Sequence, residues 1–171
     1  RVRRREGFGA RDLPSLGRVH RAARGGPDAY SCGACHHRGG IAGAGPVAAN
    51  AYYDGDGNRP ASALQRNAPS LAGAGLVELL AREITKDLQS QQAQAKAQAK
   101  QNAAPVAVAL QSKGVSFGEL RASPNGRVDY SKVTGVDRDL VVRPFGWKGH
   151  AASLRELIED QLLLHLGMQT D

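Results

Sequence analysis

The chain has 171 residues, a length that suits one domain, or one domain and part of another. Hydrophobic residues make up 41% of the chain, enough for a core, but aromatic residues make up only 5% and glycine is frequent, with 21 residues. No run of eighteen apolar residues is present, which excludes a membrane-spanning helix. The net charge is +7, and nearly all of this excess lies near the N-terminus.

Residues 1–29 are expected to form a basic N-terminal arm. Residues 1–24 contain eight arginines and two acidic residues, Glu6 and Asp12, which gives this segment a net charge of +6. We interpret the arm first as a solvated terminus and second as a docking segment for an acidic redox partner. Nucleic-acid binding is not expected, because Phe8 is the only aromatic residue that could stack on a base.

The most specific motif follows directly as Cys32-Gly33-Ala34-Cys35-His36. A C-x-x-C-H sequence is typical of covalent attachment of c-type haem. Two thiols bind the porphyrin, and the imidazole of the following histidine is the proximal ligand of the iron. The motif contains both cysteines of the chain, so no cysteine is left for a disulfide. Residues 30–171 are therefore expected to form a c-type cytochrome domain that carries one covalent haem c.

Two other interpretations of the cysteine pair are weaker. Structural zinc needs further cysteine or histidine ligands at metal spacing. No second cysteine pair exists, and the other histidines form no H-x3-5-H pair: His20, His37, His150 and His165. A redox-active dithiol is expected within a βαβ pattern, whereas a glycine-rich loop follows this motif.

A loop-rich segment spans residues 38–60 and contains Asp54-Gly55-Asp56-Gly57-Asn58. Acidic residues on alternate positions resemble the start of a calcium loop. An EF-hand would need glycine at Arg59 and glutamate at Gln65, so the match is incomplete. A polar turn is the favoured interpretation, and a partial calcium site is the alternative.

A helix is predicted from Leu76, where Leu76, Leu80, Ile84 and Leu88 recur every four residues. The preceding glycines, Gly73 and Gly75, are interpreted as close-packing points where the backbone meets the porphyrin or another helix. Residues 89–104 contain mainly glutamine, alanine and lysine, which favour a helix but offer no apolar face to bury. This part is expected to project into solvent or fray, and to end before Pro105.

Residues 115–133 predict a small β-hairpin around the turn Ser123-Pro124-Asn125-Gly126. Residues 89–133 would then form a helical and β-hairpin insertion. A last helix is predicted from Ser153, where Ser153 and Glu156 match a capping box, to a stop at Gly167. Together these elements predict a mainly α fold, namely a cytochrome c-like helical domain with long loops, a β-hairpin arm and an extended Ala/Gln/Lys helix.

The sixth ligand of the iron is expected near the end of the last helix. Met168 is the only methionine of the chain, and His165 lies three residues before it. Methionine ligation would raise the redox potential and suit electron transfer, whereas histidine ligation would lower the potential. His37 is adjacent to the proximal histidine and is expected to point elsewhere, and His150 stays open as a candidate.

Four ordered blocks resemble the di-haem oxidoreductase (thiol oxidoreductase-like) family, which is related to bacterial di-haem cytochrome c peroxidases. They are Ser31 to His36, Asn67 to Glu78, Asp139 to Gly149 and His165 to Gln169. The resemblance implies that Trp147 lies near haem, where it could aid electron passage. This chain lacks the second C-x-x-C-H of that family. We therefore expect the N-terminal part of a longer protein, a single-haem relative or one piece of a split enzyme.

The expected function is a c-type haem-binding redox protein that carries electrons, as the N-terminal part of a di-haem oxidoreductase. The alternative is peroxidase-type catalysis at an iron whose sixth position is open or can open. For that enzyme, Glu78, Glu83 and Arg143 are acid–base candidates by chemistry alone, so catalytic residues stay unassigned. The expected partner is a redox protein or a second haem domain. The expected location is periplasmic or otherwise extracytoplasmic, because covalent haem attachment takes place there.

Overall fold

The computed structural model describes residues 18–20, 29–46, 51–53, 64–146 and 149–168. The chain divides into two compact units. The first, which we call the motif unit, comprises Arg1–Ala74 and Arg155–Asp171. The second, which we call the helix–sheet unit, comprises Gly75–Leu154. Each unit is described by itself below. The basic arm, apart from residues 18–20 and Ala29, lies outside the described residues.

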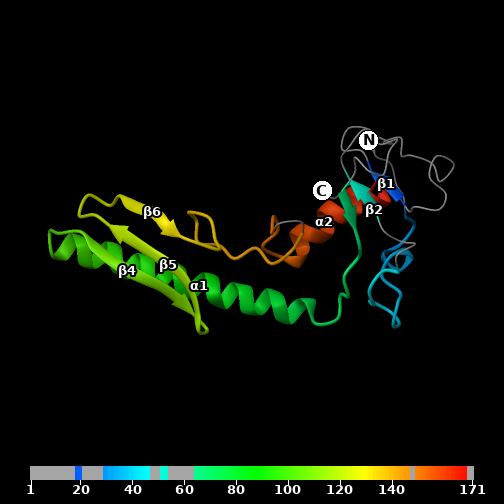
Figure 1. Cartoon of the computed structure of the whole chain (residues 1–171), viewed down its shortest axis with the longest axis horizontal. Helices are drawn as coiled ribbons and strands as arrows, with labels where there is room; N and C mark the ends of the chain where they lie inside the picture. Colours follow the sequence, from blue (N-terminus) through cyan, green and yellow to red (C-terminus); the bar gives the residue numbers. More distant parts are fainter. Residues whose placement is uncertain (1–17, 21–28, 47–50, 54–63, 147–148, 169–171) are drawn as a thin grey trace. The chain divides into compact units, whose positions relative to one another are not determined.

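The motif unit contains short elements. The strands β1 (Arg18–His20), β2 (Ala51–Tyr53) and β3 (Leu64–Arg66) form one sheet in the order β1-β2-β3. Strand β1 is parallel to β2, and β2 is antiparallel to β3. A 3₁₀ turn, η1 (Cys32–Ala34), and the helix α2 (Leu154–Leu166), which begins at the boundary between the units, complete the described elements. These elements can be followed by colour in Figure 1.

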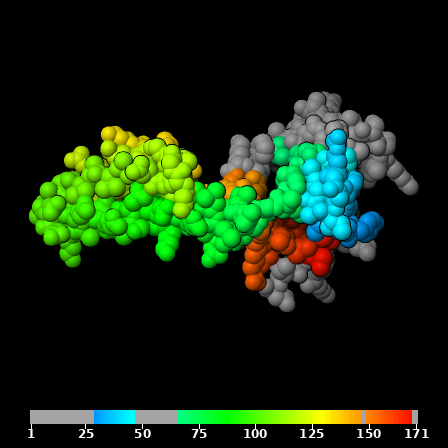
Figure 2. All heavy atoms as spheres, turned by 90° about the horizontal axis from the view of Figure 1, so that it is seen from below, coloured from blue at the N-terminus to red at the C-terminus, as the bar shows by residue number. Residues whose placement is uncertain are grey.

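The helix–sheet unit has one long helix, α1 (Ala74–Gln101), and three strands, β4 (Val106–Ser112), β5 (Val115–Ala122) and β6 (Val128–Val133). The strands form an antiparallel sheet in the order β4-β5-β6. Figures 1 and 2 show the sheet lying along the C-terminal part of α1, whereas the first turns of α1 carry no strand.

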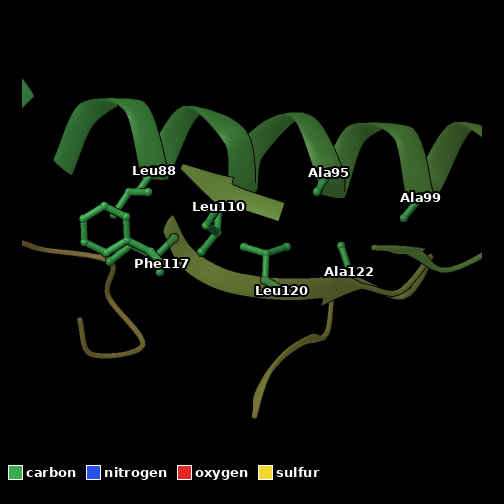
Figure 3. Packing of buried hydrophobic residues seen from close by; sticks show 8 residues of the cluster. Leu88, Ala95, Ala99, Leu110, Phe117, Leu120 and Ala122 are labelled. Carbon is green, nitrogen blue, oxygen red and sulfur yellow. The ribbon is translucent and has the colours of Figure 1, made fainter. Parts of the chain in front are cut away.

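The core of this unit lies between α1 and the inner face of the sheet. In Figure 3 the side chains of Leu88, Ala95 and Ala99 point from α1 toward the strands. Their spacing of seven and four residues places them on one side of a helix. They pack with one residue of β4, three of β5 and one after β6, and all are buried: Leu110, Phe117, Leu120, Ala122 and Leu140. The alanines leave little bulk between helix and sheet, so the two backbones can approach closely.

Glutamine side chains fasten α1 to the segments beside this core. Gln91 donates to the carbonyl of Gln111 at 2.8 Å and accepts from the amide of the same residue at 3.1 Å. Gln92 donates to the Tyr130 hydroxyl on β6 at 2.6 Å, and Gln89 donates to the carbonyl of Asp139 at 3.1 Å. The polar part of α1 is therefore bound to both outer strands and to the segment after β6.

The expectation of a mainly α, cytochrome c-like helical domain is wrong. The described residues contain two α-helices and two three-stranded sheets. One cause lies in residues 106–110, where valine alternates with alanine before a leucine, a pattern with the period of a strand. A second is that the residues after Leu88 neither project nor fray, because Ala95 and Ala99 are fully buried against the sheet.

Several local predictions are confirmed. Strands β5 and β6 flank the expected turn, which is closed by a hydrogen bond from the Gly126 amide to the Ser123 carbonyl at 2.9 Å. Helix α2 begins directly after Ser153 and ends before Gly167, whose φ of 65° is the left-handed conformation expected of a helix stop. Gly73 lies in the turn directly before α1, and its φ of 79° is the left-handed conformation that glycine adopts readily.

Candidate functional site

The C-x-x-C-H residues form a short helical turn. The amides of Cys35 and His36 both donate to the Cys32 carbonyl, at 3.1 and 2.9 Å. Ser31, directly before the turn, is extended, with φ −163° and ψ 162°. Positions separated by three and four residues lie on the same side of a helical turn, so Cys32, Cys35 and His36 share one face. Neither cysteine is in a disulfide, and Cys32 is exposed.

The ring of His36 is held in one orientation by a distant part of the chain. Its Nδ1 lies 2.8 Å from the carbonyl oxygen of Pro69. Because a carbonyl can only accept, Nδ1 carries the proton and donates. In a neutral imidazole the lone pair is then on Nε2. Histidines that bind metals almost always donate their other ring N–H in this way, which fixes the tautomer and makes the ligating nitrogen more basic.

Backbone hydrogen bonds bring Pro69 to this position. After His36 the chain doubles back through a pair of bonds between Arg38 and Ala44, at 2.8 and 3.1 Å. The loop then binds the segment around Pro69, because the Gly45 amide donates to the Ala68 carbonyl at 2.7 Å and the Leu71 amide donates to the Ala42 carbonyl at 2.8 Å. Two of the blocks that carry the family resemblance are therefore held together here.

Gly45 lies where the loop after His36 meets the segment around Ala68. An added Cβ would lie 2.9 Å from the Cys35 carbonyl oxygen and 3.1 Å from the Ala68 Cβ. Contacts below 3.0 Å to a backbone atom force the chain to shift, so only glycine fits without displacing one of the two segments. The role of Pro69 was missed by sequence reasoning, because the partner atom is a backbone carbonyl, which leaves no mark in the side-chain pattern.

The motif unit has several exposed apolar side chains, whereas Ala29 is buried. Large apolar side chains are exposed both near the motif and on α2: Tyr30, Ile41, Leu71, Ile158, Leu163 and Met168. A porphyrin bound to Cys32 and Cys35 has a large apolar surface that could cover side chains of this kind. The thiols, the fixed imidazole and the apolar surroundings together fit the chemistry of a covalent haem.

The two candidates for the sixth ligand belong to the motif unit. The amide of Ala29, three residues before Cys32, donates to the His165 carbonyl at 3.1 Å, which ties the start of the motif to the last turn of α2. Met168 follows Gly167, and its amide donates to the Leu162 carbonyl at 3.0 Å. This bond closes the C-terminal end of α2. The Met168 side chain is 53% exposed, so its thioether is accessible.

The two remaining histidine candidates lie elsewhere. The Nδ1 of His37 is 3.1 Å from the Gly33 carbonyl oxygen, so this ring is bound to the backbone of the motif's own turn. His150 is in the helix–sheet unit and lies against Gly146, where an added Cβ would come within 1.9 Å of its ring.

The three acid–base candidates are engaged in structural contacts. Glu78 accepts the amide of Leu154 at 3.0 Å, at the start of α2. Glu83 forms an ion pair with Lys113 at 2.9 Å, which raises the pKa of that lysine. Arg143 pairs with Asp139, and its guanidinium lowers the pKa of that carboxyl. None of these contacts points to acid–base catalysis.

Other predicted features lie outside the described residues. These are Trp147 and the acidic run from Asp54 to Asn58. Within the described ranges, no three histidine, cysteine or carboxylate side chains gather as a metal site. Neither described helix offers an apolar stretch of bilayer-spanning length.

No protein family model, curated protein or solved structure matches this chain. The resemblance to di-haem oxidoreductases therefore rests on the four sequence blocks alone.

Proposed function

We propose that this chain binds one haem c covalently and carries electrons. Cys32 and Cys35 would hold the porphyrin, and His36 would be the proximal ligand. The observation that carries the proposal is the 2.8 Å contact between His36 Nδ1 and the Pro69 carbonyl oxygen, which leaves Nε2 as the ligating nitrogen. When bound, the haem would supply one-electron redox chemistry, with a potential set by its ligands and burial.

The residues of this chain would do three things in such a protein. The turn Cys32–Ala34 holds the two thiols and the imidazole on one face, and the hydrogen bond from His36 fixes the ring. The exposed apolar side chains of the motif unit would exclude water from the porphyrin. Met168 is the first candidate for the sixth ligand, with His165 as the alternative, and methionine would favour a higher potential.

Electron transfer is favoured over peroxidase-type catalysis because Glu78, Glu83 and Arg143 are already bound to structural partners. We further propose membership of the di-haem oxidoreductase family, with a redox protein or second haem domain as partner and no nucleic acid. An extracytoplasmic location, such as the periplasm, follows from the same proposal.

The test is to produce the chain where c-type haem is attached and to record spectra of the oxidised and reduced protein. Covalent haem should survive denaturation and extraction, and should be lost from a variant carrying Cys32→Ser and Cys35→Ser. The matched control compares neighbouring histidines: His36→Ala should abolish the normal spectrum, whereas His37→Ala should keep it. The proposal would be refuted if the unsubstituted chain took up no covalent haem.

The identity of the sixth iron ligand distinguishes electron transfer from peroxidase-type catalysis. If Met168 binds iron, the oxidised protein shows the weak long-wavelength band of methionine–haem ligation, and Met168→Ala removes it. An equal band in the variant would exclude Met168. A high-spin spectrum that shifts when peroxide is added would favour the peroxidase-type alternative instead.

A further inference from the structure

A cavity of about 450 Å³ lies in the helix–sheet unit, and all of its lining residues belong to that unit. Part of its wall is one face of α1, where Arg82, Thr85 and Lys86 recur at helical spacing. The rest of the apolar wall comes from the segment after β6, through Val141, Val142 and Ala152. A volume of this size falls within the range of roughly 300–1,000 Å³ found for small-molecule sites.

The charged part of the cavity is positive. Arg82 and Lys86 lie one helical turn apart, and no acidic side chain lines the cavity. Within the part of the chain that the structure describes, neither cation is held in an ion pair or hydrogen bond. The adjacent carboxylate on α1, Glu83, is already neutralised by Lys113 at 2.9 Å. Two cations beside one another, in a lining without acidic side chains, suit an anionic group of a ligand.

The segment that forms the apolar wall of the cavity is held in place by hydrogen bonds. Thr85 Oγ1 accepts the amide of Val142 at 2.9 Å, which fixes this segment to α1. The carboxylate of Asp139 accepts the amide of Val141 at 3.0 Å and pairs with Arg143. Leu140, whose side chain is fully buried, has a φ of 57°. A left-handed leucine is uncommon and persists only where its surroundings fix it, so the backbone at Val141 and Val142 is held in place.

We propose that this cavity binds a small amphiphilic carboxylate, whose anionic group lies between Arg82 and Lys86 and whose apolar body contacts Val141, Val142 and Ala152. The exposed surface of the cavity is mostly apolar, and its polar side chains all come from α1: Arg82, Thr85, Lys86, Gln89 and Ser90. An apolar surface with polar groups gathered at one side is a usual form of a ligand pocket. The inference does not depend on haem binding, because every residue that it uses lies in the helix–sheet unit.

The experiment titrates the full chain with octanoate at low ionic strength and follows the backbone amide signals of Val141 and Val142 by NMR. Octanol has a similar apolar body without the charge, and should bind more weakly. A double variant, Arg82→Glu with Lys86→Glu, should weaken octanoate binding by about tenfold or more, because both contacts become repulsive. Ala152→Trp should weaken binding as well, because it occupies the apolar part.

A matched control makes the same change of charge elsewhere on α1. Lys96→Glu with Lys100→Glu alters two exposed lysines that do not line the cavity, and should keep the affinity within about twofold. Far-UV circular dichroism establishes that each variant keeps its helix. The proposal is overturned if octanoate produces no saturable shift at these amides, or if both charge-reversal variants lose affinity equally.

Discussion

Replacing Ala95 with leucine tests whether the polar half of α1 is truly part of the core. Ala95 is fully buried, and in Figure 3 its side chain points to the sheet near Leu120 and Ala122. Leucine adds three carbon atoms, which would stabilise by about 2 kcal/mol if room existed for them. The neighbours Ala99 and Ala122 are also fully buried, so this close contact has no such room. The cost of steric overlap should exceed the gain from burying the added carbons, so we expect Ala95→Leu to lower the free energy of unfolding by about 1–3 kcal/mol.

The control is Ala97→Leu, two residues further along the same helix at an exposed position. Alanine and leucine have similar helix propensities, so the difference between the two variants isolates packing against the sheet. Urea unfolding followed by circular dichroism reports mainly on α1, which has 28 residues against 13 in α2. The exposed change should alter the free energy of unfolding by less than about 0.5 kcal/mol.

Equal effects of Ala95→Leu and Ala97→Leu would refute this reasoning. That result would mean that residues after Leu88 have no buried face, as the sequence pattern alone indicates. A stabilising effect of Ala95→Leu alone would refute the close approach of α1 to the strands.

Three further predictions concern single contacts. Gln91→Ala removes two hydrogen bonds to one backbone residue and should destabilise the helix–sheet unit by about 1 kcal/mol in urea unfolding. Asp139→Asn should lower the melting temperature at neutral pH. Because Arg143 lowers the pKa of Asp139 below the ordinary 3.8, this contribution is present above that value and disappears as the pH falls through the lowered pKa. Gly45→Ala should cost about 1–3 kcal/mol in the motif unit and reduce covalent haem attachment.

Control substitutions of the same residue types show whether these effects come from the named contacts or from a general loss of stability. Gln98→Ala alters an exposed glutamine on the same helix and should be neutral. Gly75→Ala places a Cβ where no protein atom lies within 4 Å and should leave haem attachment unchanged. A melting difference for Asp139→Asn that stays constant down to strongly acidic pH would contradict the proposed ion pair.

The sequence predicted local elements better than their packing. The hairpin around Ser123–Gly126 and the end of α2 at Gly167 follow from turn and capping residues, whose effects are local. The leucine stripe correctly predicted the helix, but its burial varies along α1, because Leu88 is fully buried and Ile84 packs against the core whereas Leu76 is 73% exposed. The alanine face of α1 was missed, since alanine scores as weakly apolar and its burial depends on a sheet formed by residues far along the chain.

In the candidate site, too, the sequence predicted local features better than contacts between distant segments. Spacing alone placed Cys32, Cys35 and His36 on one face. It could not place Pro69 beside His36, because that contact depends on a loop whose backbone hydrogen bonds run through Ala42 and Gly45. Sequence blocks that resemble a family can identify which segments matter, but the contact between them is a property of the folded chain.

The paired hydrogen bonds from Gln91 to Gln111 have a consequence for how this small sheet behaves among other chains. Strand β4 pairs only with β5 in the described sheet, so its outer side is an edge. Unpaired edges recruit strands from other molecules and promote aggregation. At Gln111 a side-chain amide occupies both the donor and the acceptor that an incoming strand would need. Gln91 therefore blocks strand addition at one position of this edge as well as attaching β4 to the helix.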